Sequence, residues 1–215
     1  DIVTIDSLVN AARVVAATGG STNAALHLPA IANEAGLKFT LRDVVEIYNS
    51  TPYIGDMQPG GKYVAKDLYD VGGVPVVIKS LLDGGYINGD CITVTGKTIA
   101  ENHKEVIFPT NQDVVYKCDN PISENSSVVG LWGNLAPDGC ISKIAGLKNL
   151  TFKGKAKCFD SEEDALTAVL KNEIKAGDAV IIRYEGPKGG PGMREMLSTT
   201  RSEEHTSELQ SPLDI

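Results

Sequence analysis

A glycine-rich segment near the C-terminal end of the chain carries the residue types best suited to chemistry. Residues 180–182 read Val-Ile-Ile, which is typical of a buried strand, and residues 186–192 then contain four glycines and two prolines. Glycines let a backbone approach a ligand closely and turn its N–H groups toward an anion. Spacing alone leaves two interpretations open: a tight strand-to-helix connector, or an anion-binding loop.

Charged residues in and after this segment suggest which ligands it would take. Glu195 lies between Met193 and Met196 and offers the carboxylate that Mg²⁺ prefers. Lys188 and Arg194 could neutralise the carboxylate of a substrate. No base, nucleophile and cofactor ligands converge here, so the segment is not a complete catalytic set.

A second glycine-containing loop, Gly-Gly-Ser-Thr-Asn at residues 19–23, precedes a predicted helix. We call it the Gly19 loop. The free N–H groups and the dipole of a helix start suit an anion. The side-chain oxygens of Ser21, Thr22 and Asn23 equally suit ordinary N-capping, which is the commoner use of such residues. Both interpretations stay open.

Two other motifs favour structural roles. Gly96-Lys97-Thr98 lacks the glycine that a phosphate-binding loop needs five positions before Gly96, where Cys91 stands. Thr98 instead opens a predicted capping box with Glu101. His27 lies in an apolar helix, and we expect it to be a hydrogen-bonded core residue rather than a ligand.

The elements that must position these residues divide the chain into a helical part and a strand-rich part. Glycines and capping residues predict helices over residues 8–17, 24–35, 40–48, 63–70 and 76–82, with a short helix near residue 102. Strands are predicted over residues 128–132, 141–144, 151–158 and 179–184, with one helix over residues 165–170.

This order predicts an α/β plus β fold. Residues 1–110 would form the C-terminal part of an N-terminal α/β domain whose sheet lies elsewhere, and residues 111–126 a polar linker. Residues 127–200 would form the first part of a C-terminal β-barrel-like or sandwich domain.

Composition excludes several classes of protein. The 215 residues are 42% hydrophobic with a net charge of −8, which argues against a nucleic-acid partner. No apolar run approaches the ~20 residues of a membrane span. The four cysteines form no C-x-x-C pair, so we expect buried free thiols in a reducing compartment and neither a zinc nor a redox site. They are Cys91, Cys118, Cys140 and Cys158.

The two ends of the chain look unlike the ends of a complete protein. The chain begins with Asp1 rather than with an initiator methionine, so we expect it to come from the middle of a longer protein. Residues 201–215 are polar, lack a periodic apolar face and resemble a translated sequencing adapter. We expect them to be a non-native disordered tail and assign no role to His205.

Several segments, taken in order over residues 1–200, resemble the dihydroxy-acid dehydratase family, part of a broader family that includes 6-phosphogluconate and sugar-acid dehydratases. The Gly-Lys-Tyr-Val and Val-Thr-Gly-Lys-Thr motifs favour the dihydroxy-acid branch. The segments are residues 19–24, 26–28, 61–64, 89–98, 133–139, 159–163 and 183–197.

The resemblance implies a hydro-lyase that converts a 2,3-dihydroxy-3-methyl acid to a 2-keto acid in the synthesis of valine, isoleucine and leucine. An iron–sulfur cluster, 2Fe–2S or 4Fe–4S, would take the leaving hydroxyl as a Lewis acid, and Mg²⁺ would hold the substrate. The parent would be a homodimer or higher homo-oligomer, cytoplasmic in bacteria or organellar in eukaryotes. The alternatives are a sugar-acid or 6-phosphogluconate dehydratase, or a non-enzymatic binding module.

The same resemblance makes Glu195 a Mg²⁺ ligand and places Ser21, Thr22 and Asn23 near the substrate. The family's cluster cysteines, carbamylated lysine and other Mg²⁺ carboxylates precede the region represented here, and its serine base follows it. The chain therefore contains no predicted catalytic residue, and we expect it to be inactive by itself.

Overall fold

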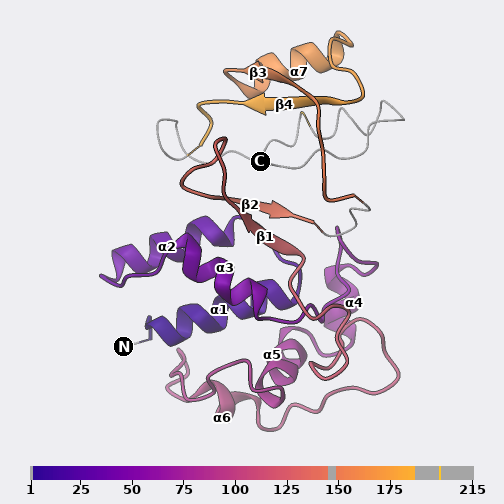
Figure 1. Cartoon of the computed structure of the whole chain (residues 1–215). Coiled ribbons are helices and arrows are strands. Elements are labelled where there is room, and N and C mark those ends of the chain that lie inside the picture. Colours follow the sequence, from indigo (N-terminus) through magenta and orange to yellow (C-terminus); the bar gives the residue numbers. More distant parts are fainter. Residues whose placement is uncertain (1, 145–148, 187–198, 200–215) are drawn as a thin grey trace. The chain divides into compact units, whose positions relative to one another are not determined.

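The computed structural model describes residues 2–144, 149–186 and 199 (Figure 1). The chain divides into two compact units, Asp1–Leu147 and Lys148–Ile215. Within the described residues, the first unit holds six helices and a two-stranded sheet, and the second holds one helix and another two-stranded sheet. The described part is therefore a mixed α/β fold, which confirms the predicted fold class. The described strands do not form a closed barrel.

Capping residues set the helix starts of the first unit. Thr4, Thr40 and Thr98 each accept a hydrogen bond from the N–H three residues on and form a capping box. The box predicted at Thr98 and the helix start predicted at residue 40 are confirmed, and the box at Thr4 starts the first helix earlier than expected. The helices are α1 (Ile5–Ala17), α2 (Ala24–Glu34), α3 (Leu41–Asn49), α4 (Ala65–Asp70), α5 (Val74–Asp83) and α6 (Ile99–His103).

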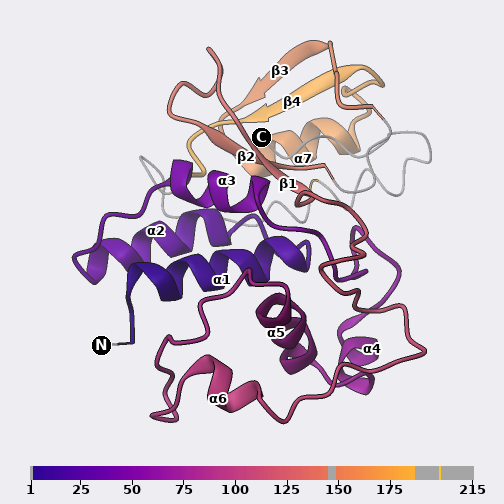
Figure 2. The ribbon, with the colours of Figure 1, turned by 60° about the horizontal axis from the view of Figure 1, so that its bottom comes forward.

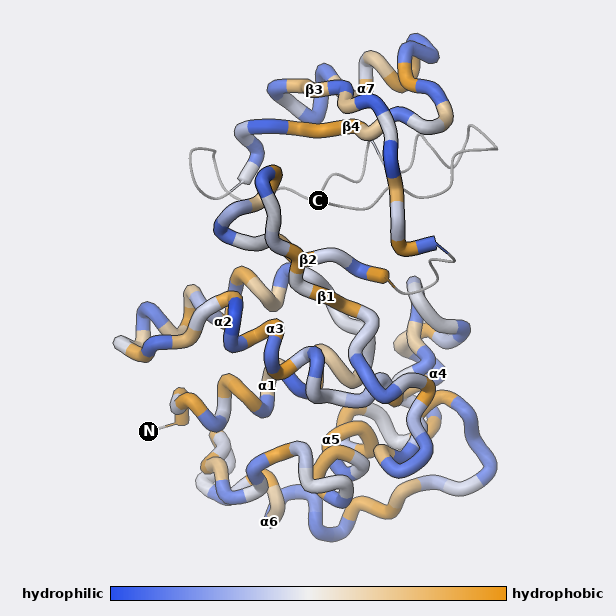
Figure 3. Tube along the Cα trace, viewed as in Figure 1, coloured by the Kyte–Doolittle hydropathy of each residue, from blue (hydrophilic) through white to orange (hydrophobic). Residues whose placement is uncertain are grey.

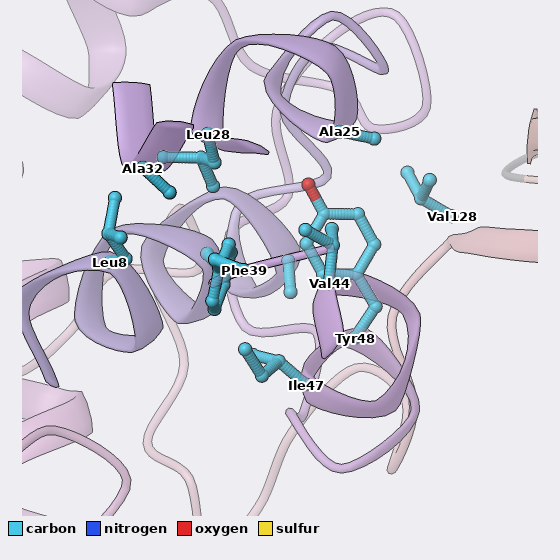
Figure 4. Packing of buried hydrophobic residues seen from close by; sticks show 11 residues of the cluster. Leu8, Ala25, Leu28, Ala32, Phe39, Val44, Ile47, Tyr48 and Val128 are labelled. Atoms are coloured by element: carbon cyan, nitrogen blue, oxygen red, sulfur yellow. The ribbon is translucent and has the colours of Figure 1, made fainter. Parts of the chain in front are cut away.

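Helices α1, α2 and α3 pack around one hydrophobic cluster (Figure 4). Ala12 and Ala16 on α1 are fully buried, and their small side chains let the neighbouring helices approach closely. Tyr48 of α3 is also fully buried, and its ring lies among the aliphatic side chains of the cluster. Val128, far along the sequence, completes this core.

Helix α5 is the centre of a second cluster and lies beside α1 and α6 (Figure 2). Val77 and Leu81 are its most deeply buried residues. Ile54 and Val115 pack against them from the chain segments on either side of α4–α6. Ala17 at the end of α1 belongs to this second cluster, so α1 contributes to both cores.

The sheet of the first unit is a hairpin of β1 (Val128–Leu131) and β2 (Cys140–Lys143). The strands are antiparallel, with Val128 opposite Lys143. Strand β1 packs on α3. Val128 fills the helical core, so the hairpin packs within the first compact unit. The separate domain expected over residues 127–200 stays a prediction.

The second unit contains a βαβ arrangement. Strands β3 (Lys155–Phe159) and β4 (Asp178–Ile182) are parallel, and α7 (Glu162–Leu170) connects them and packs on both. Residues Val180–Ile182 form the apolar stretch of β4 in Figure 3. Their prediction as a strand is confirmed, but the buried pattern is wrong: all of β4 is only partly buried. In the described residues, α7 covers this two-stranded sheet and no further strand pairs with it.

Among the described residues, no helix is both long enough and apolar enough to span a membrane.

Candidate functional site

The Gly19 loop begins where α1 ends in a Schellman motif. The N–H of Gly20 donates to the carbonyl of Val15 at 2.9 Å, and the N–H of Gly19 donates to Ala16 at 3.3 Å. Gly19 has φ 59°, the left-handed conformation that this motif requires and glycine adopts at little cost. The motif stops α1 and turns the chain into the loop.

Helix α2 starts without the predicted side-chain cap, which corrects the capping interpretation of the loop. Asn23 occupies the N-cap position but makes no capping hydrogen bond, because its φ −58° and ψ −25° are helical rather than extended. Its own N–H donates to Ser21 Oγ at 3.2 Å. The next two N–H groups donate to the carbonyls of Ser21 and Thr22.

Local turns therefore satisfy the first N–H groups of α2 and leave the loop side chains available. Within the described part of the chain, the Thr22 hydroxyl and the Asn23 carboxamide have no hydrogen-bond partner. Both residues are half-buried, and Ser21 is exposed. The loop thus presents three polar side chains in a row that can donate to, or accept from, an oxygen-rich ligand.

The ring of Tyr53 and the hydroxyl of Ser127 lie against Gly19. An ideal Cβ on Gly19 would be 2.8 Å from Tyr53 Cε2 and 3.1 Å from Ser127 Oγ, so a side chain does not fit there. The hydroxyls of Tyr53 and Ser127 are buried and, among the described residues, without a hydrogen-bond partner. Burial, with a contribution from the Asp56 charge, raises the pKa of Tyr53 and keeps its phenol protonated.

Lys143, the last residue of β2, contacts the Gly19 loop although the two are far apart in the sequence. Its Nζ donates to the carbonyl of Gly19 at 2.8 Å and to that of Gly20 at 3.4 Å. Desolvation lowers the pKa of this partly buried amine. Sequence reasoning missed Lys143, because 124 residues separate it from Gly19 and no motif marks it.

A second turn, residues 93–97, is the Thr93 turn. Asn102 Nδ2 donates to Thr93 Oγ1 at 2.8 Å and to Thr95 Oγ1 at 3.0 Å. The N–H of Thr93 donates to the Lys97 carbonyl at 2.9 Å, and Thr98 then caps α6. The capping interpretation of Gly96-Lys97-Thr98 is confirmed.

Comparison with known proteins places this chain in a family. A model of the dihydroxy-acid/6-phosphogluconate dehydratase N-terminal region matches residues 1–102, and a model of the C-terminal region matches residues 113–210. The chain belongs to this dehydratase family. The Gly19 loop lies in the N-terminal match, whereas Ser127 and Lys143, which contact it, lie in the C-terminal match.

Relatives of the dehydratase family resemble nearly the whole chain. The chain is 66% identical over 200 residues to the dihydroxy-acid dehydratase of Pelagibacter ubique, covering 93% of this chain and 35% of the relative. It is 62% identical over 200 residues to dihydroxy-acid dehydratase 2 of Bradyrhizobium diazoefficiens, with the same coverage. The chain thus spans about a third of the length of these relatives.

The predicted metal and anion ligands of the dehydratase chain lie outside the described residues. These are Lys188, Arg194 and Glu195, whose roles stay predictions. Residues 201–215 also lie outside them. The C-terminal match runs to residue 210, into the predicted non-native tail, whereas the alignment with each relative named above spans 200 residues. The origin of the tail stays a prediction.

The described residues by themselves do not fit an iron–sulfur cluster or a Mg²⁺ site. No group of three or more His, Cys, Asp or Glu side chains among them could hold a metal. The four cysteines are unbridged, as expected, but Cys158 is exposed and the other three are only partly buried. Burial raises the pKa of Cys91, Cys118 and Cys140, which disfavours the thiolate form that binds iron.

His27 is not a core residue. It lies on the exposed face of α2, although Leu28 beside it is buried. The apolar composition of α2 led to the wrong prediction. The helix buries only one face, and His27 lies on the opposite, exposed face.

Proposed function

We propose that the full-length protein carrying this chain is a dihydroxy-acid dehydratase, a hydro-lyase. It would convert a 2,3-dihydroxy-3-methyl acid to the 2-keto acid in branched-chain amino-acid biosynthesis. Support comes from the names of the relatives, which are 66% and 62% identical over 200 residues. Both regions of the family match the chain in the expected order.

Within that enzyme, we assign the Gly19 loop to substrate binding. The observation that carries this is the row of polar side chains at Ser21, Thr22 and Asn23, of which Thr22 and Asn23 have no partner within the described residues. A dihydroxy acid has two hydroxyls and a carboxylate, which match hydroxyl and carboxamide groups as hydrogen-bond partners. The well-fixed loop would hold the acid in one orientation.

The remaining parts of the site are proposals from the family. Glu195 would be one Mg²⁺ ligand, and Lys188 and Arg194 would neutralise the substrate carboxylate. The iron–sulfur cluster would supply a Lewis acid for the leaving hydroxyl when bound. Because the described residues form no metal site, we assign no catalytic step to them.

We also propose that the strand-rich part contributes to a β-barrel-like domain in the full-length protein, which would be a homo-oligomer in the bacterial cytoplasm. The two-stranded sheets β1–β2 and β3–β4 would be the first strands of that domain.

A second candidate is a 6-phosphogluconate or sugar-acid dehydratase, because the matching family models include 6-phosphogluconate dehydratases. The relatives named dihydroxy-acid dehydratase favour the first candidate. No contact in the described residues favours a non-enzymatic binding module.

A chimera tests the proposal. It replaces the matched segment of the Pelagibacter ubique relative with that of this chain. We expect the chimera to form the 2-keto acid from 2,3-dihydroxyisovalerate and the 215-residue chain alone to form none. Turnover of 6-phosphogluconate or an aldonic acid in place of the branched acid would favour the second candidate.

Loop variants of the chimera test the assignment of the Gly19 loop. Thr22→Val and Asn23→Leu should each raise KM about fivefold or more, the effect of losing a hydrogen bond of ~1 kcal/mol. Thr110→Val, at an exposed threonine outside the loop, is the control. Equal KM values in the loop and control variants would refute the substrate role of the loop.

A further inference from the structure

We infer that Lys143 is a positioning residue for the Gly19 loop and acts through the carbonyls of Gly19 and Gly20. This rests on the proposed function for its consequence in catalysis, but the clamp itself rests only on geometry. Lys143 Nζ bonds both carbonyls, at 2.8 and 3.4 Å. These two carbonyls directly precede the polar side chains of the loop.

The main-chain carbonyls at the end of α1 show why the loop needs this amine. The carbonyls of the last four α1 residues all have donors within the first unit, mostly backbone N–H groups. Beyond the helix, the carbonyls of Gly19 and Gly20 accept hydrogen bonds from a side chain distant in sequence, that of Lys143. The α1 pairs are Thr18→Val14, Gly20→Val15, Gly19→Ala16, and Ile54 and Gly55→Ala17.

Charge explains why a lysine stands there. The last turn of α1 has no basic residue of its own. The carbonyl end of a helix carries partial negative charge and favours a cation within the last turn. Among the described residues, no carboxylate forms an ion pair with Lys143, so main-chain oxygens are its partners. Its position is therefore tied to the loop rather than to another side chain.

The β1–β2 hairpin fixes the backbone position of Lys143. Lys143 pairs with Val128, which is fully buried in the core of α1–α3. The N–H of Ile144 donates to the Ser127 carbonyl at 2.8 Å, and Ser127 Oγ lies against Gly19. The packed hairpin thus holds the loop at two points, by a hydrogen-bonding cation and by a close contact.

Three variants of the chimera test the clamp. Lys143→Met removes the donor and the charge, Lys143→Gln keeps an N–H donor without the charge, and Lys143→Arg keeps both. Lys38→Met, at an exposed lysine of the same unit, is the matched control. If the methionine variant fails to fold by circular dichroism, the glutamine and arginine variants carry the test.

Two readouts separate the clamp from the substrate role. Hydrogen exchange of a peptide covering residues 18–24 should be about tenfold faster in Lys143→Met, intermediate in Lys143→Gln and near the parent in Lys143→Arg. KM should rise about fivefold in Lys143→Met with kcat within about twofold, because the loop would bind rather than react.

Each outcome decides one point. Exchange in Lys143→Met equal to that in Lys38→Met would overturn the clamp. Faster exchange with an unchanged KM would support the clamp and refute the proposed substrate role of the loop. Faster exchange and a raised KM, both restored by Lys143→Arg, support the inference as a whole.

Discussion

The Gly19 loop and the Thr93 turn are both glycine-containing turns that lead into a helix, yet they are held in opposite ways. The Thr93 turn bonds to itself and to Asn102, all within ten residues of sequence. The Gly19 loop is held by Tyr53 and by Lys143, which is 124 residues away.

This difference separates a turn that forms locally from one that needs the tertiary fold. The Thr93 turn can form whenever its own residues meet, at a low cost in chain entropy. The Gly19 loop also receives a long-range contact, because the hairpin of β1 and β2 packs on α3 and brings Lys143 to it. The conformation of the proposed substrate loop therefore depends on the tertiary packing of the first unit, whereas that of the Thr93 turn does not.

The largest expected effect comes from adding one methyl group to each turn. Gly19→Ala should destabilise the chimera by about 2–5 kcal/mol, from a left-handed alanine (~1–2) and overpacking (~1–3). The new Cβ would lie 2.8 Å from Tyr53 Cε2. Gly96→Ala should cost only about 1–2 kcal/mol, because φ is 76° but nothing lies within 4 Å. Denaturant unfolding measures both, and equal losses would remove the distinction between the turns.

A smaller effect is expected from Asn102→Ala. It removes the carboxamide that binds Thr93 and Thr95 and should cost about 1 kcal/mol per lost hydrogen bond. Hydrogen exchange should quicken in residues 93–97 and stay unchanged in the Gly19 loop. A matching change in the Gly19 loop would show that the two turns are coupled.

The smallest effect at neutral pH is expected from Tyr48→Phe, in the core of α1–α3. The Tyr48 hydroxyl is buried without a partner among the described residues, so its removal should change stability by less than about 1 kcal/mol, in either direction. Burial raises the pKa of Tyr48 from 10.0 to about 12. Its protonated form therefore contributes stability that is present below pH 10 and is lost as pH rises through about 12.

Tyr48→Phe should remove that pH dependence, so the variant should gain stability relative to the parent at about pH 11. Unfolding curves at about pH 7 and about pH 11 check this. Tyr69→Phe, at a tyrosine that is 79% exposed, is the control. An equal alkaline gain in both variants would contradict the role assigned to burial.

Local signals made most of the helices predictable. The capping boxes at Thr40 and Thr98 start α3 and α6, and Gly19 ends α1, because each signal acts within four residues. The strands were placed to within a few residues for the same reason. The exposure of His27 was not predictable from composition, since it depends on which stripe of α2 meets the core.

The candidate site was only half predictable. Ser21, Thr22 and Asn23 stand out in the sequence as polar residues after two glycines, but their side chains do not cap α2. That outcome depends on the helical backbone conformation of Asn23, which its residue type does not reveal.

The sequence by itself determined the family, the presence of most helices and the positions of both turns, because these depend on residue type over short spans. Only the tertiary structure decided that Lys143 and Ser127 meet Gly19. Burial of Val128 among α1–α3 brings the hairpin there, and no local pattern encodes which distant strand fills a given core. The loop proposed to bind substrate therefore lies in one part of the chain, and residues from a distant part of the chain hold it in position.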